Sequence, residues 1–383
     1  MTEVHIVEAL RTPMGKVGGS LSEIHPVDLA AHLLTGLIER SGVDPAAVDD
    51  VIFGCIDQVG AQGANIARNA WLAAGLPDHV PAVTIDRQCG SSQQGVHFAA
   101  QGILAGSYDI AVAAGVESMS RVPLGTAWEA GPDLGVGFPF DADGWVERFG
   151  SGEVHQFGAA DLIARQWNLT GGAMAEFAAE SHHRAARACA RGDFDREILP
   201  VGEFRHDETI RPDTTPEVIA GLRPLVEGSS ISIGVASQIA DGASGVVLAS
   251  AEAVDRHGLA SLGVIRGMTA VGSDPTLMLT GPIPATKKVL VRAGIGIDDI
   301  DLFEVNEAFA SVVLAWAAET GADLSRTNVN GGAISLGHAL GCTGTRLMTT
   351  LVHELQRRNA RWGLETVCEG GGLANATLIE RAS

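Results

Sequence analysis

The chain has 383 residues, 46 % of them hydrophobic and 19 % charged, which is enough for two or three domains, each with a hydrophobic core. Its formal net charge is −20 at pH 7. Binding to nucleic acid or to an anionic membrane surface is therefore disfavoured, and an anionic ligand needs local basic residues or helix N-termini. We expect no signal peptide and no membrane span, because the sequence shows neither a basic stretch before an apolar core at its start nor a run of about 18 apolar residues.

The five cysteines stand at positions 55, 89, 189, 342 and 368. They have neither the density nor the even number of a disulfide framework. We therefore expect a reducing compartment and assign the protein to the cytoplasm.

Alternating strands and helices are predicted for the first part of the chain. Apolar runs predict strands, and apolar residues at helical spacing predict helices. In chain order the predictions are a strand at 4–7, a helix over 27–40, a short helix and a strand within 41–55, a helix over 65–74, a strand at 83–85, a helix over 91–104 and a strand at 110–116. Such alternation is typical of an α/β sheet covered on both faces.

The pattern changes between about residues 117 and 235. Gly, Pro, Asp and Trp interrupt 121–150, helical segments run through 155–158 and 174–191, and the region holds much of the chain's arginine. We interpret it as a loop domain inserted into the α/β domain and as the place where an anionic ligand binds. Solvated arginines on helix faces are the alternative for most of them. The α/β pattern resumes with a glycine-bearing turn over 237–243 before a strand at 246–249.

Two parts of the chain resemble each other. The segment 293–306 aligns without gaps on 41–54, and in both a glycine-bearing loop leads through an acidic turn to an apolar strand. A weaker similarity pairs 84–86 with 328–330, each predicted as a strand before a turn and a helix. The sequence therefore predicts a duplicated α/β domain, with the strand-end loops of both halves at a shared cleft.

Cys89 lies on the turn between the strand at 83–85 and the helix that begins at Ser91. A helix N-terminus offers N–H groups and a positive dipole end, which favour a thiolate over a thiol. Gly90 leaves room beside the thiol for an incoming carbonyl group. These features indicate a nucleophile, and the alternative for any one cysteine is a buried structural residue.

Three further motifs follow predicted strands of the second half. They are Asn306-Glu307-Ala308-Phe309, the glycine-rich stretch 328–344 with His338 and Cys342, and Cys368-Glu369-Gly370-Gly371-Gly372. Each has a structural alternative, because Asn and Gly form turns and a histidine among glycines is commonly a hydrogen-bonded structural residue. A zinc site at His338 and Cys342 is disfavoured, because the glycines interrupt a shared helical face and no further ligands complete it.

Together these motifs resemble those of the thiolase family. The similarity rests on Asp-Arg-Gln-Cys-Gly-Ser-Ser at 86–92, on the three motifs of the second half and on the stretches 8–13 and 281–288. Several motifs in order at family spacing are a specific signal. The resemblance implies a five-layer αβαβα sandwich of two α/β halves. It also implies an N-terminal thiolase domain over 1–260, with an inserted loop domain at about 117–235, and a C-terminal thiolase domain over 261–383.

The resemblance further implies an acyltransferase that makes or breaks a carbon–carbon bond in coenzyme A thioesters. By resemblance Cys89 is the acylated nucleophile, His338 its base and Cys368 the second acid/base. Asn306 holds a water for the enolate oxygen, and the N–H groups of Cys89 and Gly370 bind the oxyanion.

Coenzyme A and acyl-CoA are expected as substrates, with no permanently bound cofactor and no metal. By resemblance the ligand contacts are made by Arg211, Ser237, Phe157, Met278 and Phe309. The family pattern also implies a homodimer or homotetramer.

The sequence departs from the family pattern at three places. Ala339 follows His338 where Pro is usual, and Leu373-Ala374-Asn375 follows the triple glycine where Gln-Gly is common. Gln156 and Phe157 replace a His before a Met that is frequent in acetoacetyl-CoA thiolases, which points away from that short substrate. The motifs Asp-Arg-Gln-Cys-Gly-Ser-Ser-Gln-Gln at 86–94 and Cys-Glu-Gly-Gly-Gly at 368–372, with the ending Ile-Glu-Arg at 379–381, together look most like actinobacterial thiolases linked to steroid degradation.

The main hypothesis is thus a degradative 3-ketoacyl-CoA thiolase of fatty-acid or steroid catabolism. A biosynthetic acetyl-CoA C-acetyltransferase is the alternative within the same class. A ketoacyl synthase-like condensing enzyme is disfavoured by the Cys368 motif. A non-catalytic acyl-CoA- or lipid-binding protein is disfavoured by the presence of both Cys89 and Cys368, since a binding module has no use for two thiols.

Overall fold

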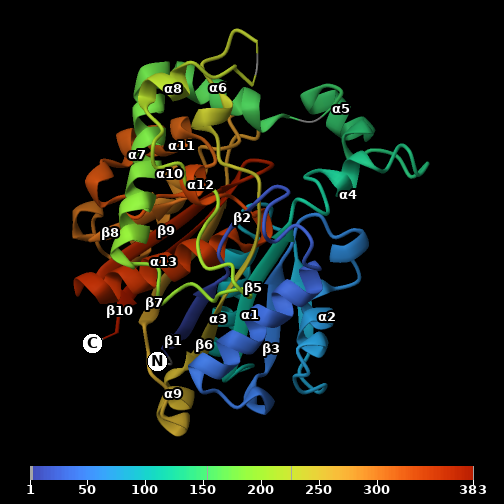
Figure 1. Cartoon of the computed structure of the whole chain (residues 1–383), viewed down its shortest axis with the longest axis vertical. Helices are drawn as coiled ribbons and strands as arrows, with labels where there is room; N and C mark the ends of the chain where they lie inside the picture. Colours follow the sequence, from blue (N-terminus) through green and yellow to red (C-terminus); the bar gives the residue numbers. More distant parts are fainter. Residues whose placement is uncertain (1–2, 153, 226, 383) are drawn as a thin grey trace.

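The computed structural model describes residues 3–152, 154–225 and 227–382. Within these residues the chain forms two α/β halves whose strands belong to one ten-stranded mixed sheet (Figure 1). The order is β4-β3-β5-β6-β1-β7-β10-β9-β8, and β2 pairs with β6. The strands are β1 (Val4–Arg11), β2 (Gly15–Lys16), β3 (Asp50–Gly54), β4 (Ala82–Ile85), β5 (Ile110–Ser118), β6 (Ala240–Ser250), β7 (Gly263–Gly272), β8 (Leu302–Val305), β9 (Trp362–Glu369) and β10 (Leu373–Arg381).

The two halves have the same pattern of parallel and antiparallel strands. In the first half β3 pairs in parallel with β4 and β5, and β6 and β1 follow in antiparallel pairing. In the second half β8 pairs in parallel with β9, and β10 and β7 follow in antiparallel pairing. The halves meet at β1 and β7, which pair only at His5–Val264 and Ile6–Gly263.

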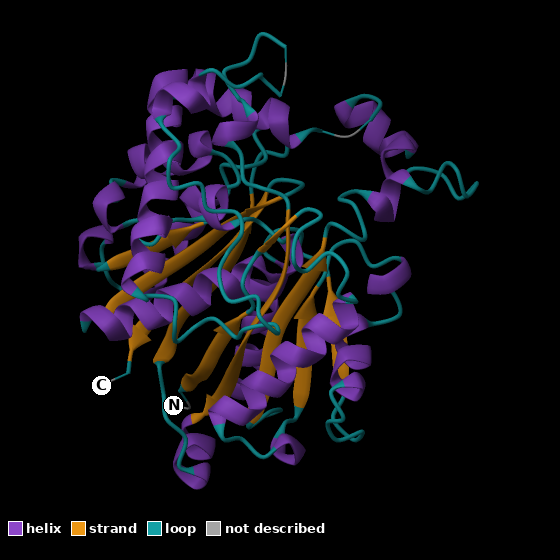
Figure 2. Cartoon of the chain, viewed as in Figure 1, coloured by secondary structure: helices purple, strands orange, loops and turns teal. Residues whose placement is uncertain are grey.

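Helices cover the strands in layers, as Figure 2 shows. The helices are α1 (Pro26–Ser41), α2 (Ile66–Ala73), α3 (Ser91–Leu104), α4 (Thr126–Glu129), α5 (Asp143–Phe149), α6 (Gln156–Gln166), α7 (Gly171–Arg191), α8 (Pro216–Ala220), α9 (Ala251–His257), α10 (Pro282–Ala293), α11 (Ala310–Thr320), α12 (Ala333–Leu336) and α13 (Thr343–Arg358). One core lies between α1, α2 and the strands of the first half, and another between α10, α11 and the strands of the second half. A third core packs α3 and α13 between the two groups of strands.

Side-chain alternation explains how one strand serves two cores. Along β5, Val112 and Ala114 pack in the core of α1 and α2, whereas Ala111 and Ala113 pack in the central core of α3 and α13. A strand buried on both faces reads as a continuous apolar run, as this one does. The layers are therefore helix, strand, helix, strand, helix, which confirms the expected five-layer αβαβα sandwich.

The duplication is visible in matching details. Gly42 and Gly294 both end a helix with φ +70°. Asp49 and Asp301, at equivalent positions, each accept two backbone hydrogen bonds at the start of the neighbouring strand, from residues 109 and 110 and from residues 361 and 362 respectively. The ungapped alignment of 41–54 with 293–306 therefore identified two copies of one structural unit.

Two predicted elements differ in the structure. Residues 328–330 form no strand, because the Asn328 side chain takes over the pairing: its Oδ1 accepts from Val305 N at 2.8 Å and its Nδ2 donates to Val305 O at 2.8 Å. Only Thr327 bridges to Phe303. The turn predicted over 237–243 is also wrong beyond its first residues, because β6 already begins at Ala240 and pairs its polar residues with β5 and β2.

The segment between β5 and β6 carries α4 to α8. Figure 1 shows α4 and α5 projecting from the body, whereas α6, α7 and α8 lie over the second half. Apolar residues of α6 and α7 pack with those of α11 in one cluster, which also contains Cys368. No helix in the described part of the chain is both long enough and apolar enough to cross a membrane.

Candidate active site

Cys89 sits on a constrained turn between β4 and α3. Its neighbour Gln88 has φ +49°, in the left-handed region that non-glycine residues rarely adopt. Asp86 Oδ1 accepts the Gln88 N–H at 2.7 Å, and Ser91 Oγ donates to the Gln88 carbonyl at 2.6 Å. Backbone in such a conformation persists only when its surroundings hold it, and it is commonly found at functional sites.

Burial and neighbouring acids keep Cys89 in the thiol form. They raise its pKa well above the ordinary value, with burial as the largest cause, followed by Cys368 and Glu369. The N–H groups of Cys89 and Gly370 face the sulfur and act in the opposite direction. The thiolate expected from the helix N-terminus is therefore not the resting state, because burial outweighs the N–H groups.

His338, in the loop between α12 and α13, is a neutral base. Thr343 Oγ1 donates to Ala339 O at 2.9 Å, so at the 2.6 Å contact with His338 Nδ1 the threonine oxygen accepts. This network places the ring proton on Nδ1 and leaves Nε2 as the acceptor. Burial lowers the His338 pKa to about 3, so the ring is uncharged at neutral pH.

Asn306 and Cys368 lie at the ends of the adjacent strands β8 and β9. Asn306 Nδ2 is 3.4 Å from His338 Nε2, and its amide also faces the Cys368 sulfur. Cys368 is fully buried, and this raises its pKa to about 12. Asn306 Oδ1 is buried and has no hydrogen-bond partner among the described residues. The structure thus brings together Cys89, Gly370, Cys368, Asn306 and His338 from four separate loops.

The predicted ligand-binding residues lie around this group. Met278 and Phe309 are buried in the cluster that contains Cys368, and Phe157 packs against that cluster with its ring 5.8 Å from the ring of Phe309. Ser237 donates its N–H to Ala308 O at 2.9 Å.

Arg211 is exposed, and Gln238 lies between it and the His338 loop. Its Nη2 donates to Gln238 Oε1 at 3.1 Å, and the Gln238 carbonyl accepts the His338 N–H at 2.8 Å. An exposed guanidinium next to the histidine loop suits a phosphate at the rim of a site.

Two buried glutamates hold the site loops and were not predicted. Glu117 accepts from Gly341 N at 2.9 Å and from Ile56 N at 3.0 Å, which ties the histidine loop to the first half. Glu307 accepts from Asn328 Nδ2 at 2.9 Å and from Ile334 N at 3.1 Å. The sequence did offer a signal for Glu117, because this acidic residue stands near the end of the otherwise apolar run of β5. A carboxylate buried there needs several hydrogen-bond donors.

The departures from the family pattern leave the site loops well held. Ala339 has φ −73°, close to the value that proline would impose, and its carbonyl accepts from both Cys342 N and Thr343 Oγ1. Residues 373–375 form regular strand pairs with both β9 and β7. Neither change interrupts the local backbone.

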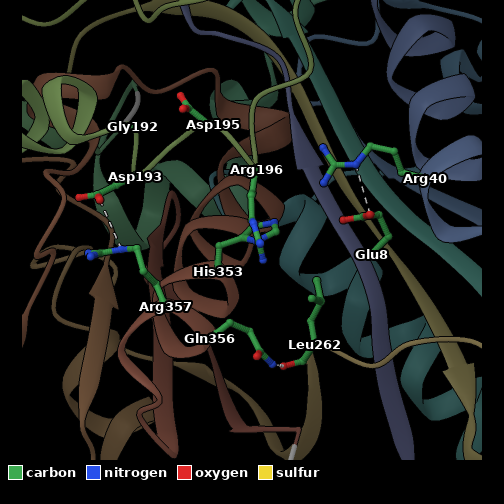
Figure 3. Close-up of a pocket in the computed structure, with 10 residues that line it drawn as sticks. All are labelled: Glu8, Arg40, Gly192, Asp193, Asp195, Arg196, Leu262, His353, Gln356 and Arg357. Atoms are coloured by element: carbon green, nitrogen blue, oxygen red, sulfur yellow. Dashed lines mark hydrogen bonds and ion pairs between the residues drawn. The ribbon is translucent and has the colours of Figure 1, made fainter.

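A cavity of about 750 Å³ lies elsewhere, between α1, α13 and the end of α7. Figure 3 shows Arg40 facing Glu8 and Arg357 facing Asp193 across it. None of the predicted site residues lines this cavity. Among the described residues, no group of three or more His, Cys, Asp or Glu side chains could hold a metal ion.

The fold consists of two copies of an α/β unit. The loops after their strands bring together two thiols and a neutral histidine, so the protein has a cysteine-centred site. The chain matches the family models "Thiolase, N-terminal domain" over residues 4–252 and "Thiolase, C-terminal domain" over residues 259–381. It is 51 % identical to the steroid 3-ketoacyl-CoA thiolase FadA6 of Mycobacterium tuberculosis, over 100 % of this chain and 95 % of that protein. The chain belongs to the thiolase family.

Solved structures agree with this assignment. The acetyl-CoA acetyltransferase of Bacillus anthracis has a TM-score of 0.91 at 37 % identity, over 100 % of this chain and 99 % of that one. The human mitochondrial 3-ketoacyl-CoA thiolase in complex with CoA has a TM-score of 0.89 at 34 % identity, over 100 % and 98 % of the two chains.

Proposed function

We propose that the protein cleaves 3-ketoacyl-CoA thioesters with coenzyme A, in fatty-acid or steroid catabolism. The observation that carries this proposal is the proximity of two thiols, Cys89 and Cys368, with Asn306 beside Cys368 and His338 in contact with Asn306. One thiol can carry the acyl group while the other moves a proton.

In the proposed first step, Cys89 forms a bond to the 3-keto carbon of the substrate. The thiol proton passes to His338 Nε2, and the carbonyl oxygen becomes an oxyanion that accepts from the N–H groups of Cys89 and Gly370. The bond between C2 and C3 then breaks, and the leaving enolate takes a proton from Cys368 to give acetyl-CoA. Asn306 and His338 face the enolate oxygen.

In the second step, the thiol of coenzyme A gives its proton to Cys368 and attacks the thioester on Cys89. The Cys89–acyl bond breaks, the shortened acyl-CoA leaves, and Cys89 recovers its proton from His338. Both side chains thereby return to the uncharged forms that their pKa directions favour.

Coenzyme A enters this cycle as a substrate, and no permanent cofactor takes part. We assign its phosphates to Arg211 and its pantetheine arm to Ser237. The acyl tail is assigned to Phe157, Met278 and Phe309, whose apolar side chains share the cluster around Cys368. We propose a bulky or acid-bearing acyl tail and, as the more specific form of the proposal, a steroid-derived one. The name of the Mycobacterium tuberculosis relative supports the steroid-derived tail.

We also propose a division into domains at about residue 260, with the loop domain at about 117–235, and a cytoplasmic homodimer or homotetramer. The short pairing of β1 with β7 supports the division. The outer edge of β4, which pairs with no strand of the described residues, and the projecting segment of α4 and α5 support self-association, because exposed strand edges and apolar surfaces are usually covered. The five free cysteines support a reducing compartment.

The experiment is coenzyme A-dependent cleavage of a panel of 3-ketoacyl-CoA thioesters, from acetoacetyl-CoA to long, branched and dicarboxylic tails. We expect turnover that is highest on bulky or acid-bearing tails and that is lost in Cys89→Ala. Highest turnover on acetoacetyl-CoA would instead assign the protein to the acetyl-CoA C-acetyltransferases. Ligand binding without turnover of any thioester would overturn the catalytic proposal.

A further inference from the structure

Glu369 is a buried carboxyl group that the proposed reaction does not use. It follows Cys368 on β9, is fully buried, and neither of its oxygens has a hydrogen-bond partner among the described residues. A buried carboxylate without a partner is strongly unfavourable, so such a group is either neutral or serves the site.

The carboxyl group rests on the backbone of the Cys89 turn. A Cβ atom placed on Gly90 would lie 1.9 Å from Glu369 Oε1 and 2.7 Å from its Cδ. Gly90 has φ −93° and ψ 9°, which other residues also adopt. Gly90 therefore leaves the space that the Glu369 carboxyl group occupies, and a side chain at this position would displace that carboxyl group.

Few charged groups surround this carboxyl group. Arg87 and Asp86 face it from the turn before Cys89, and the thiols of Cys89 and Cys368 face it from either side. From β10 the N–H of Asn375 lies near the carboxyl group but does not reach hydrogen-bond geometry. Burial raises the Glu369 pKa to about 8, and Arg87 is the main opposing influence. The group is therefore neutral at pH 7 and becomes charged in mildly alkaline solution.

We propose that Glu369 is a positioning residue whose neutral form permits, and whose ionised form opposes, formation of the Cys89 thiolate. The proposal rests on the proposed function of Cys89 as nucleophile. A negative charge at Glu369 lies beside the sulfur that must become anionic, and next to Gly370, whose N–H would bind the oxyanion. As the pH rises, Glu369 releases its proton to solvent and exchanges none with the substrate.

The test measures alkylation of Cys89 by iodoacetamide between pH 6 and pH 10 in the full-length protein, followed by mass spectrometry of the Cys89 peptide. Each protein is normalised to its own rate at pH 7. In the wild type, we expect the rise with pH to flatten above about pH 8, because Glu369 ionises there. In Glu369→Gln the rise continues, so that the normalised rates differ by about tenfold at pH 9.5, the effect of one unit of pKa. Superimposable profiles would overturn the proposal.

Glu369→Asp is the matched variant, because it keeps a titratable carboxyl group and supports the test if the Gln variant does not fold. We expect its alkylation profile to flatten as in the wild type. A profile that rises without flattening in Glu369→Asp would contradict the role of charge.

The pH dependence of kcat/KM for thioester cleavage separates this proposal from the proposed function. We expect kcat/KM to fall above about pH 8 in the wild type and to fall at higher pH in Glu369→Gln. Alkylation profiles that differ while no thioester is cleaved would retain the role of Glu369 and refute the function. Thioester cleavage combined with identical alkylation profiles would retain the proposed function and refute the role of Glu369.

Discussion

Cys89 and His338 are both uncharged in the resting site, because burial raises the pKa of the thiol and lowers that of the imidazole. Moving the proton from Sγ to Nε2 creates two buried charges, which is unfavourable unless new interactions compensate. The N–H groups of Cys89 and Gly370 can supply them once a carbonyl oxygen lies between them. The site is therefore expected to generate its thiolate mainly with substrate bound, and alkylation of the resting thiol is expected to be slow at neutral pH.

The tautomer of His338 gives a prediction at this scale. Thr343→Val removes the oxygen that accepts from Nδ1 but keeps the shape of the side chain. Without that acceptor the imidazole ring can turn or take the other tautomer. A positioned general base contributes about 10²–10⁴-fold to the rate, so kcat should fall by roughly tenfold or more. Steady-state cleavage kinetics measure this effect.

Thr349→Val is the control for this change. It lies on the same helix, and among the described residues its hydroxyl donates to the Thr345 carbonyl one turn earlier and to no other group. Its kcat should stay near that of the wild type. An equal loss of kcat in both variants would show that the hydroxyl acts through the stability of α13 and not through His338.

The residues that we propose for nucleophilic and acid/base chemistry could be selected from the sequence, because each stands in a short motif after a predicted strand. Glu117 and Glu369 could not. A carboxyl group between apolar residues indicates burial, but the donors to Glu117 and the contact of Glu369 with Gly90 come from residues far away in the sequence. The sequence also could not predict that burial raises the pKa of Cys89 and favours its thiol form, because burial is a property of the assembled site.

At the scale of elements, the duplication explains why loops from both halves meet at the candidate site. Asp49 and Asp301 close equivalent loops, and each anchors the first N–H groups of the parallel strand beside it. The amino ends of β3 and β8 are thereby fixed relative to β5 and β9. Asn306 follows the opposite, carboxyl end of β8, where its own N–H donates to Thr366 O at 3.0 Å.

Asp301→Ala is predicted to reduce stability without changing the chemistry. It leaves the N–H groups of Arg361 and Trp362 without their acceptor, which should lower the free energy of unfolding by about 1 kcal/mol. Urea unfolding measures the loss. Asp298→Ala, in the same loop but exposed and with no side-chain hydrogen bond to the part of the chain that the structure describes, should be close to neutral. Equal stabilities of the two variants would contradict the anchoring role.

The elements that the sequence predicted well are those with a clear apolar period. The helix predicted over 91–104 has the bounds of α3, and the strand predicted at 110–116 lies within β5. The strand expected at 328–330 failed, because a side-chain amide can make the same two hydrogen bonds as a backbone strand. Hydrophobic patterning contains no information about such a replacement.

At the scale of the whole molecule, buried ionisable groups set opposing dependences of stability on pH. Burial lowers the pKa of His97 and of His338 to about 3 and that of His182 to about 4. Between these values and about 6.5 the unfolded chain binds protons that the native protein does not, so these histidines reduce stability as the pH falls.

Glu117 and Glu369 act in the other direction. Burial raises their pKa values to about 7 and about 8. Between about 4.5 and these values the native protein binds protons that the unfolded chain has lost, so stability falls as the pH rises through this window. The net charge of −20 at pH 7 also grows more negative with pH, and self-repulsion acts in the same sense.

We therefore predict that the melting temperature is higher near pH 5.5 than at pH 8.5, by a few degrees. Thermal unfolding followed by circular dichroism across this range measures it. Glu369→Gln separates the local cause from general repulsion, because it removes one buried titration while the other acidic residues remain. The fall in melting temperature between the two pH values should be smaller in that variant. A melting temperature that rises from pH 5.5 to pH 8.5 in the wild type would contradict the prediction, because it would mean that the buried histidines outweigh the buried carboxyl groups.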